Sequence, residues 1–223
     1  RGLGDVYKRQ LLRCINLLET AQKGHIYVDG QPIGFSINSD GTLVRAKEKE
    51  INNPNACCLA TADSLGYPSA RMVLIKTFDN RGFSFYTNLN SRKAQDLSRN
   101  VKAALCFHWK STGKQVRVEG PVIDIPNSEA DNYFKSRDRE SQIGAWVSKQ
   151  SSFLSTGLSK LDQEFNREKE RIGNKEVARP HFWSGKIVVP EKIEFWKSRA
   201  SRLHERILFT AYKDEWKKEY LYP

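Results

Sequence analysis

Short runs with strand character, separated by turn residues, constrain the fold of this chain most strongly. Beyond Ile51, residues 57–63, 69–78 and 82–88 (CCLATAD, SARMVLIKTF and GFSFYTN) have strand patterns, and Asp, Asn and Gly residues lie between them. Further strand patterns cover residues 101–109, 114–125, 181–189, 192–198 and 205–212. Meandering strands with helices placed between them favour an α+β fold, a barrel or a sandwich, over a parallel βαβ sheet.

Three helices are predicted between the strands. Residues 91–100 (SRKAQDLSRN) form a short helix with Ser91 as N-cap. Residues 127–137 (NSEADNYFKSR) form a second helix with an Asn or Ser cap and early acidic residues. A longer helix is predicted over residues 158–172, with an apolar stripe of Leu158, Leu161, Phe165 and Ile172.

Length, charge and cysteine usage narrow the class of protein. A chain of 223 residues suits one sizeable domain with its own core. The net charge of +11 fits a nucleic acid, an anionic membrane or a small phosphorylated ligand as partner. No apolar run approaches the ~18 residues of a membrane helix, and the first residues show no signal-peptide layout. Cys14, Cys57, Cys58 and Cys106 form no CxxC pair and no metal-ligand spacing with the histidines, so we expect a reducing, cytoplasmic setting and no metal.

The first fifty residues do not follow the strand pattern. Residues 11–34 (LLRCINLLETAQKGHIYVDGQPIG) resemble the segment after the phosphate-binding loop in ATP-binding subunits of polar amino-acid ABC transporters. The chain contains no Walker A sequence, so we expect no ATP binding. The string DVYKRQ resembles a translated sequencing adapter. We therefore expect residues 1–50 to be a foreign segment (adapter over 1–10, transporter fragment over roughly 11–46) and residues 51–223 to be the functional domain; a native extension is the alternative.

Two cations bracket the apolar run in residues 69–76 (SARMVLIK). Side chains alternate along a strand, so Arg71 and Lys76 are predicted to point to opposite faces. This stretch alone leaves open whether they are surface cations on an edge strand or ligands of an anion. Similar alternation places Arg117 and Glu119 on one face, where they predict a structural ion pair.

Six strings occur in a fixed order: NACCLATAD, PSARMVLIK, FYTNLNSRKAQDL, KQVRVEGPV, YFKSRDRESQIGAWVSKQSS and IEFWKSRASRLHERI. Together they resemble the pyridoxamine (pyridoxine) 5′-phosphate oxidase family over about residue 51 to the C-terminus. The resemblance implies an FMN-binding split β-barrel and a homodimer with FMN at the subunit interface. It also implies oxidation of pyridoxamine or pyridoxine 5′-phosphate by O2 to pyridoxal 5′-phosphate with release of H2O2, and no nucleic-acid or membrane partner.

FMN and the vitamin substrate each carry a phosphate, so one site must satisfy two dianions. Arg and Lys do this through charge-assisted hydrogen bonds. By resemblance, the FMN contacts are Arg71, Met72, Val73, Leu74, Ile75, Lys76, Tyr86, Thr87, Arg92, Lys93, Gln115, Gln150, Ser151, Trp196 and Arg206.

The substrate phosphate is expected to bind a site that combines a cationic side chain with hydroxyl groups. Tyr133 and Arg137, at i and i+4, are predicted to project from one helical face, with Ser141 in the turn that follows. By resemblance, the substrate contacts are Lys76, Tyr133, Arg137, Ser141, Arg202, Leu203 and His204.

The segment Arg202-Leu203-His204 lies nearest to the chemistry by resemblance, with Arg202 and His204 as catalytic residues. In a strand, these two share a face and Leu203 turns to the core. His204 can either donate a hydrogen bond to the pyridine hydroxyl or help to move a proton, and both roles remain open. The other histidines, His25, His108 and His181, are predicted to be structural.

The chain departs from the family pattern at Thr77, where Gly is usual, at Lys114, where Arg is usual, and at Glu205, where Asp is usual. The family's leading helix and the segment that closes over substrate have no match here. Another FMN split-barrel flavoprotein, such as a flavin reductase-like enzyme or a flavin carrier, is the first alternative function. A basic nucleic-acid binder and an ATPase-related module are more remote alternatives.

Overall fold

The computed structural model describes residues 53–155, 157–213 and 215–223, together with four short strands nearer the N-terminus. The adapter-like residues 1–10 and most of the transporter-like segment lie outside the described residues. The four short strands pair as β1 with β2 and β3 with β4. Their bounds are β1 (Tyr27–Val28), β2 (Gln31–Pro32), β3 (Phe35–Ile37) and β4 (Leu43–Arg45).

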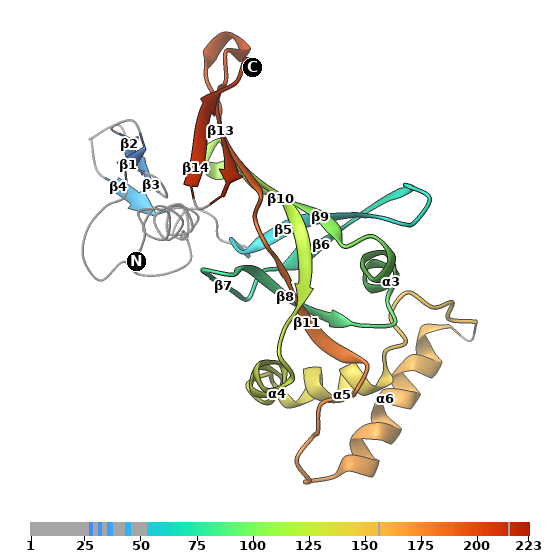
Figure 1. The fold of residues 1–223 in the computed structure, drawn as a ribbon. Coiled ribbons are helices and arrows are strands. Elements are labelled where there is room, and N and C mark those ends of the chain that lie inside the picture. The colour runs from blue at the N-terminus through green and yellow to red at the C-terminus, as the bar shows by residue number, and fades with distance from the viewer. Residues whose placement is uncertain are drawn as a thin grey trace.

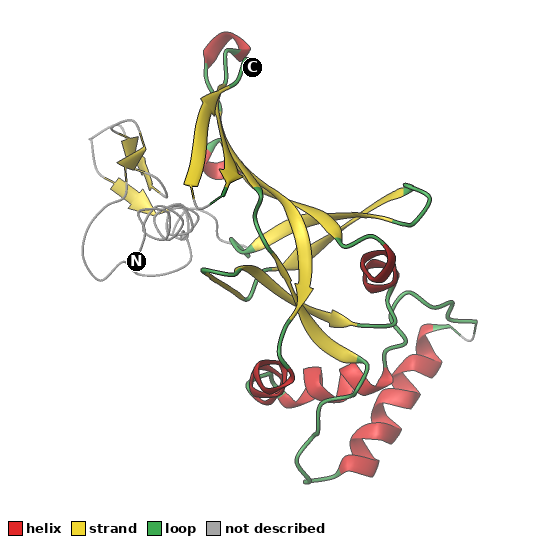
Figure 2. Cartoon of the chain, viewed as in Figure 1, coloured by secondary structure: helices red, strands yellow, loops and turns green. Residues whose placement is uncertain are grey.

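Ten antiparallel strands form one strongly curled sheet, as Figures 1 and 2 show. Along its main path the strands lie in the order β14-β13-β12-β10-β11-β8-β7, and a branch runs from β10 through β9 and β5 to β6. The strands are β5 (Ala56–Ala62), β6 (Pro68–Leu74), β7 (Thr77–Asp79), β8 (Gly82–Asn88), β9 (Lys102–Trp109), β10 (Lys114–Asp124), β11 (Trp183–Val188), β12 (Lys192–Lys197), β13 (Glu205–Tyr212) and β14 (Glu215–Tyr220). The predicted α+β split barrel is confirmed.

The long strand β10 joins the two halves of the sheet. Its first part pairs with β9 on one side and with β12 on the other, and its last residues, Val122 to Asp124, pair with β11 instead. At the change of partner, a Cβ on Gly120 would lie 1.9 Å from the carbonyl oxygen of Val189, so only glycine fits there. This crossing allows one strand to belong to both walls of the barrel.

The single strand predicted over residues 69–78 is wrong in one respect, because the structure divides it. β6 pairs with β5, whereas β7 pairs with β8. Between them Ile75 is buried, and the Lys76 amide donates to the carbonyl oxygen of Ser84 at 2.9 Å. The chain therefore changes neighbours at Lys76, which lies at the corner where the two halves meet.

Four α-helices in the described part of the chain lie outside the sheet: α3 (Arg92–Arg99), α4 (Asn127–Lys135), α5 (Arg139–Val147) and α6 (Leu158–Ile172). Figure 1 shows α4, α5 and α6 together at one end of the molecule and the β13–β14 hairpin at the opposite end. The predicted Asn or Ser cap of α4 is wrong, since Pro126 occupies the N-cap position. The predicted stripe on α6 is only partly buried: Ile172 is enclosed, but Leu158 is exposed.

Aromatic and branched side chains from both halves of the sheet fill the core, including Phe83, Phe85, Leu105, Phe107 and Phe209. Cys57 is buried there, and burial raises the pKa of its thiol to about 12. Cys58, on the opposite strand face, is only half-buried. Among the described residues, no His, Cys, Asp and Glu cluster is suited to a metal ion, and no helix is long and apolar enough to cross a membrane.

Candidate functional site

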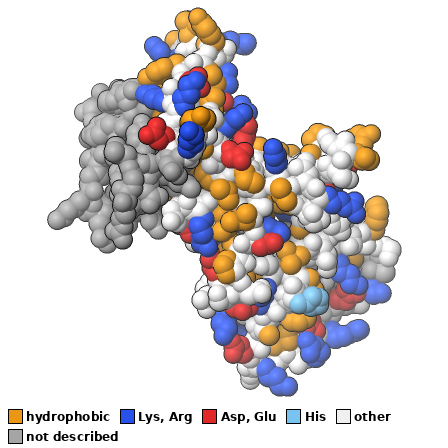
Figure 3. Space-filling view, viewed as in Figure 1, with side chains coloured by type: hydrophobic (Ala, Val, Ile, Leu, Met, Phe, Trp, Pro, Cys, Tyr) orange, Lys and Arg blue, Asp and Glu red, His pale blue; other side chains and the backbone are white. Residues whose placement is uncertain are grey.

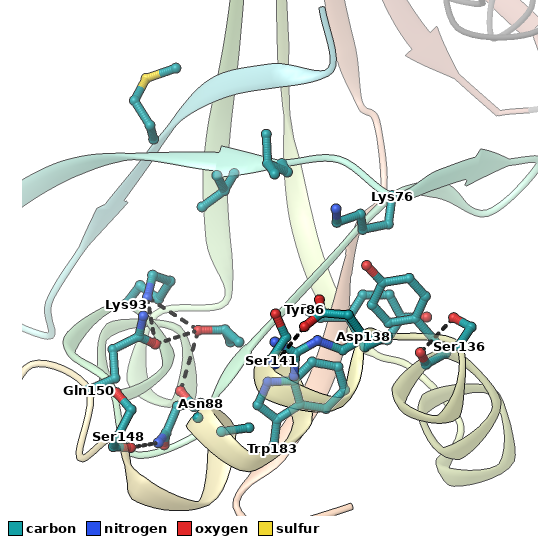
Figure 4. Close-up of a pocket in the computed structure, with 18 residues that line it drawn as sticks. Lys76, Tyr86, Asn88, Lys93, Ser136, Asp138, Ser141, Ser148, Gln150 and Trp183 are labelled. Atoms are coloured by element: carbon teal, nitrogen blue, oxygen red, sulfur yellow. Dashed lines mark hydrogen bonds between the residues drawn. The ribbon is translucent and has the colours of Figure 1, made fainter. Parts of the chain in front are cut away.

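A cleft of about 770 Å³ lies between the barrel and the helical end of the molecule. Its walls come from β6, β8, the first turn of α3, helices α4 and α5 with their connection, the residues just after α5 and the start of β11. Figure 4 shows two polar groups of side chains in it, one around Lys93 and Gln150 and another between Lys76 and Ser136. The sequence-predicted residues that line the cleft are Met72, Val73, Leu74, Lys76, Tyr86, Thr87, Lys93, Tyr133, Arg137, Ser141 and Gln150.

Lys93 forms the cationic end of the cleft nearest α3. Its Nζ lies 3.2 Å from Thr87 Oγ1, 3.2 Å from Gln150 Oε1 and 3.4 Å from Ser91 Oγ. All three are neutral oxygens, and burial, together with the nearby charge of Arg71, lowers the pKa of the Lys93 amine. Ser91 occupies the predicted N-cap position but makes no capping hydrogen bond with its side chain. A buried ammonium group surrounded by hydroxyl and amide oxygens suits an added anion.

Arg71 and Arg92 are not among the residues that line the cleft. The Arg71 guanidinium donates to Thr61 Oγ1 at 2.7 Å and lies 3.7 Å from the carboxylate of Asp96. Burial opposes the charge of Asp96, yet hydrogen bonds from Thr61 and Ser69 and the charge of Arg71 hold the pKa of Asp96 below its usual value. Arg92 is exposed on α3. Arg71 thus belongs to a polar network with Thr61, Ser69 and Asp96, and it is near enough to Lys93 for its charge to act on that amine.

Arg137 forms the other cationic end. Among the described residues its Nη1 is buried without a hydrogen-bond partner, and burial lowers the pKa of the guanidinium. Tyr133, Ser141 and Lys76 line the cleft with it. A buried donor without a partner is costly in a folded protein, which marks this position as one that a ligand can complete.

The local structure around Arg137 differs from the sequence prediction. Helix α4 ends at Lys135, so Arg137 lies in the connection and not on the helical face of Tyr133. Ser141 lies in the first turn of α5, not in a turn between elements, and its amide donates to Asp138 Oδ1 at 2.8 Å. The side chains of Tyr133, Arg137 and Ser141 nevertheless all line the cleft.

A stack of aromatic rings forms the wall beside Arg137. The rings of Tyr86 and Tyr133 lie 3.9 Å apart, and Tyr86 stacks on Trp183 at 5.3 Å. Burial raises the pKa of the Tyr86 phenol to about 12. The guanidinium of Arg137 lies 4.9 Å from the Trp183 ring. The sequence analysis did not predict Trp183 as a site residue. An aromatic residue at the start of an apolar strand has the same sequence pattern as a core residue.

A second group of predicted residues lies on one face of the other half of the sheet. Gln115 pairs with Trp196, and Trp196 pairs with Arg206, so the three lie side by side across β10, β12 and β13. Arg206 Nε donates to the buried Glu194 at 2.8 Å, and Arg117 also donates to Glu194. The ion pair predicted between Arg117 and Glu119 is present at 2.8 Å. None of these side chains lines the cleft described above.

The segment Arg202-Leu203-His204 also lies outside that cleft, and its predicted strand geometry is wrong. Ala200–Arg202 form a 3₁₀ turn, and Leu203 is exposed instead of facing the core. Ser201 and Arg202 both have left-handed backbone angles, with φ of 57° and 59°. Such strain in non-glycine residues gathers at functional sites.

The imidazole of His204 is held on two sides. Its Nδ1 accepts a hydrogen bond from the Arg199 amide at 3.3 Å, and its ring lies 4.6 Å from that of Trp196. An acceptor at Nδ1 places the proton of the neutral ring on Nε2. His204 therefore presents an N–H donor at its free edge.

The remaining predicted residues are dispersed. Ile75 is buried in the barrel core, and Ser151 is exposed in the turn after Gln150. Of the other histidines, His108 is exposed on β9, His181 packs edge-on against Phe182, and His25 lies outside the described residues. Basic side chains show no single large patch on the face in Figure 3, where they alternate with acidic ones.

Two family models match the sequence. Residues 43–164 match the family described as pyridoxamine 5′-phosphate oxidase, and residues 183–223 match the pyridoxine 5′-phosphate oxidase C-terminal dimerisation region. The pyridoxine/pyridoxamine 5′-phosphate oxidase of Anaeromyxobacter dehalogenans is 48% identical over 181 residues, which cover 81% of this chain and 91% of that protein. The protein of the same name from Brucella anthropi is 50% identical over 185 residues, covering 81% and 90%.

Two solved structures share the architecture. The structure of PhzG from Burkholderia lata, in complex with tetrahydrophenazine-1-carboxylic acid, superposes with a TM-score of 0.73 at 28% identity and covers 77% of this chain and 84% of its own. A pyridoxamine 5′-phosphate oxidase-related, FMN-binding protein from Nostoc punctiforme gives a TM-score of 0.65 at 16% identity, over 80% and 94% of the two chains. The second likeness shows the fold alone.

Proposed function

The chain belongs to the pyridoxamine 5′-phosphate oxidase family of oxidoreductases, and from that premise we propose that it oxidises pyridoxamine or pyridoxine 5′-phosphate to pyridoxal 5′-phosphate. FMN is the proposed cofactor, and O2 is the proposed electron acceptor, with release of H2O2. The observation that carries the proposal is a cleft lined by two cations, the buried Lys93 and the half-buried Arg137, neither of which forms an ion pair with a carboxylate among the described residues.

The Lys93 end fits the phosphate of FMN. Its ammonium group has only neutral oxygens around it, and the hydroxyls of Thr87 and Ser91 can turn to donate to a phosphate. The apolar side chains of β6 and the ring of Tyr86 on β8 border the same cleft, as a flat aromatic cofactor requires. When bound there, FMN would supply the acceptor for a hydride from the C4′ carbon of the substrate.

The Arg137 end fits the phosphate of the substrate. Arg137 provides an unsatisfied donor, and Tyr133, Ser141 and Lys76 add hydroxyl groups and a second positive charge on the same cleft. Holding both phosphates fixes hydride donor and acceptor relative to each other, which lowers the entropic part of the barrier. These residues therefore bind and orient, while the redox chemistry belongs to the cofactor.

A second copy of the chain is proposed to complete the site. The C-terminal match is to the family's dimerisation region, and Gln115, Trp196 and Arg206 gather on a sheet face apart from the cleft. We infer that this face, with Arg202 and His204, meets the cleft of the partner. One chain would then hold the two phosphates, and the other would cover the reacting ring.

Of the two roles left open for His204, donation of a hydrogen bond fits the structure better. Its Nδ1 is occupied by the Arg199 amide, so proton abstraction through Nε2 would first require the tautomer to change. We propose that Nε2–H donates to the oxygen substituent of the pyridine ring.

Paired substitutions at His204 separate the two roles. Glutamine places an amide N–H near the position of Nε2, so His204→Gln is expected to keep kcat/KM within about fivefold of the wild type, whereas His204→Asn, with a shorter reach, loses roughly tenfold to a hundredfold. Steady-state kinetics over a range of pH would measure this. Equal losses of a hundredfold or more in both variants would instead indicate a general base.

The domain boundary stays a proposal. We propose that residues 51–223 supply every residue of the site in each chain and that the preceding segment is foreign, although the family match begins slightly earlier, at residue 43. Sequencing the genomic locus would test this, because an uninterrupted native reading frame through residues 1–50 would contradict it.

The proposed activity is tested on the purified chain in three steps. We expect a flavin absorption spectrum, saturable uptake of FMN by flavin-free protein, and H2O2 release on addition of pyridoxamine 5′-phosphate but not of inorganic phosphate. Flavin uptake without H2O2 release from either vitamer phosphate would favour another FMN split-barrel flavoprotein, and a protein that takes up no FMN would refute the proposal.

A further inference from the structure

The Arg137 guanidinium is in an unusual position for a charged group. It is partly buried, and no carboxylate forms an ion pair with it among the described residues. Two aromatic rings lie against it: its Cζ is 4.9 Å from the centroid of the Trp183 ring and 5.6 Å from that of the Phe134 ring. The carboxylate of Asp138 acts on it only as a nearby charge, without an ion pair. Removal of a cation from water is costly, so the two rings must supply part of the compensation.

Trp183 is itself held firmly in place. It opens β11, opposite Asn88 on β8, and its carbonyl oxygen accepts a hydrogen bond from Arg179 at 2.6 Å. Arg179 also donates to Asp131 on α4 at 2.6 Å, which ties the strand to that helix. The indole stacks on Tyr86 with an interplanar angle of 10° and receives the edge of Phe134 at 5.1 Å. An indole held in this way can restrict the position of the Arg137 guanidinium that lies over it.

We propose that Trp183 is a positioning residue, whose indole holds the Arg137 guanidinium at the cleft for the phosphate of the substrate. This inference rests on the proposed function. The ring stabilises the cation through its π face and leaves the positive charge available, whereas a carboxylate partner would compete with the incoming phosphate. The lack of a hydrogen-bond partner for Arg137 Nη1 among the described residues is thereby explained as readiness for a ligand.

The test is a double-mutant cycle between Trp183 and Arg137. Trp183→Met fills much of the volume without a π face, Trp183→Phe keeps a ring, and Arg137→Leu removes the cation. For each variant we would measure kcat and KM with pyridoxamine 5′-phosphate, the inhibition constant of inorganic phosphate, FMN affinity and thermal stability. We expect W183M to raise KM and the phosphate inhibition constant roughly tenfold with kcat and FMN affinity little changed, and W183F to raise them no more than about threefold.

In the R137L background the W183M substitution is expected to have no further effect on KM, because Trp183 acts through Arg137. Additive effects on KM, or an equal loss of FMN affinity and phosphate affinity, would overturn the proposal and assign Trp183 to general packing. If W183M does not fold, the cycle is run with W183F, whose smaller rise in KM must also vanish in R137L. Flavin binding and H2O2 release by the wild-type chain are measured first, so failure of the proposed function is recognised separately.

Discussion

Arg137→Leu is expected to raise the KM for pyridoxamine 5′-phosphate by roughly a hundredfold, because a charge-assisted contact of about 3 kcal/mol to the phosphate is lost. FMN affinity is expected to remain within about twofold, since Lys93, not Arg137, lies at the proposed FMN phosphate end. The stability of the folded chain should not fall. Arg137 Nη1 has no hydrogen-bond partner to lose, and removal of a half-buried charge offsets the loss of the contacts with the Trp183 and Phe134 rings.

The matched control for this substitution is Lys135→Leu. Lys135 lies two residues away at the end of α4, is exposed, and pairs with Glu176 at 3.3 Å outside the cleft. The Lys135→Leu substitution removes one positive charge from the same region. A similar rise in KM in both variants would therefore show that general electrostatics, and not a contact of Arg137, causes the rise. Calorimetry with inorganic phosphate and thermal unfolding of both variants complete the comparison.

The strand pattern of the sequence predicted the fold because alternation and turn residues are local properties. The division of residues 69–78 into β6 and β7 was not predictable in the same way, since it depends on which distant strands, β5 and β8, are available as partners. The geometry at Arg137 depended likewise on where α4 ends and α5 begins. An i, i+4 spacing predicts a shared face only if the helix continues through both residues.

The predicted site residues fall into two groups that one chain does not bring together. Lys76, Lys93, Tyr133 and Arg137 line the cleft, whereas Trp196 lies on the other sheet face beside Gln115 and Arg206. Spacing along a sequence carries no information on which residues come from a second copy. Trp183 was missed for another reason: its role depends on the cation above it, and nothing in its own strand pattern distinguishes it from a core residue.

Arg202→Leu is expected to lower kcat by roughly a hundredfold or more while FMN binding is retained. In the proposed dimer the Arg202 side chain faces the reacting ring, where it makes a charged contact in the transition state worth about 3 kcal/mol. The strained backbone supports this role, because Ser201 and Arg202 are both left-handed with φ of 57° and 59°. Strain of about 1–3 kcal/mol per residue persists only where the surrounding structure imposes it, and it orients the side chain.

Two controls separate the side chain from the strain. Ser201→Gly relieves the strain of the left-handed backbone at the residue before Arg202. We expect it to raise the free energy of unfolding by up to about 1 kcal/mol with kcat little changed. Arg199→Leu removes a neighbouring exposed cation and keeps the backbone amide that binds His204, so turnover should also be retained. Single-turnover reduction of the bound flavin, followed by its absorbance, measures the chemical step directly. If R202L reduces the flavin as fast as R199L does, Arg202 has no part in that step, and the strain must serve the fold alone.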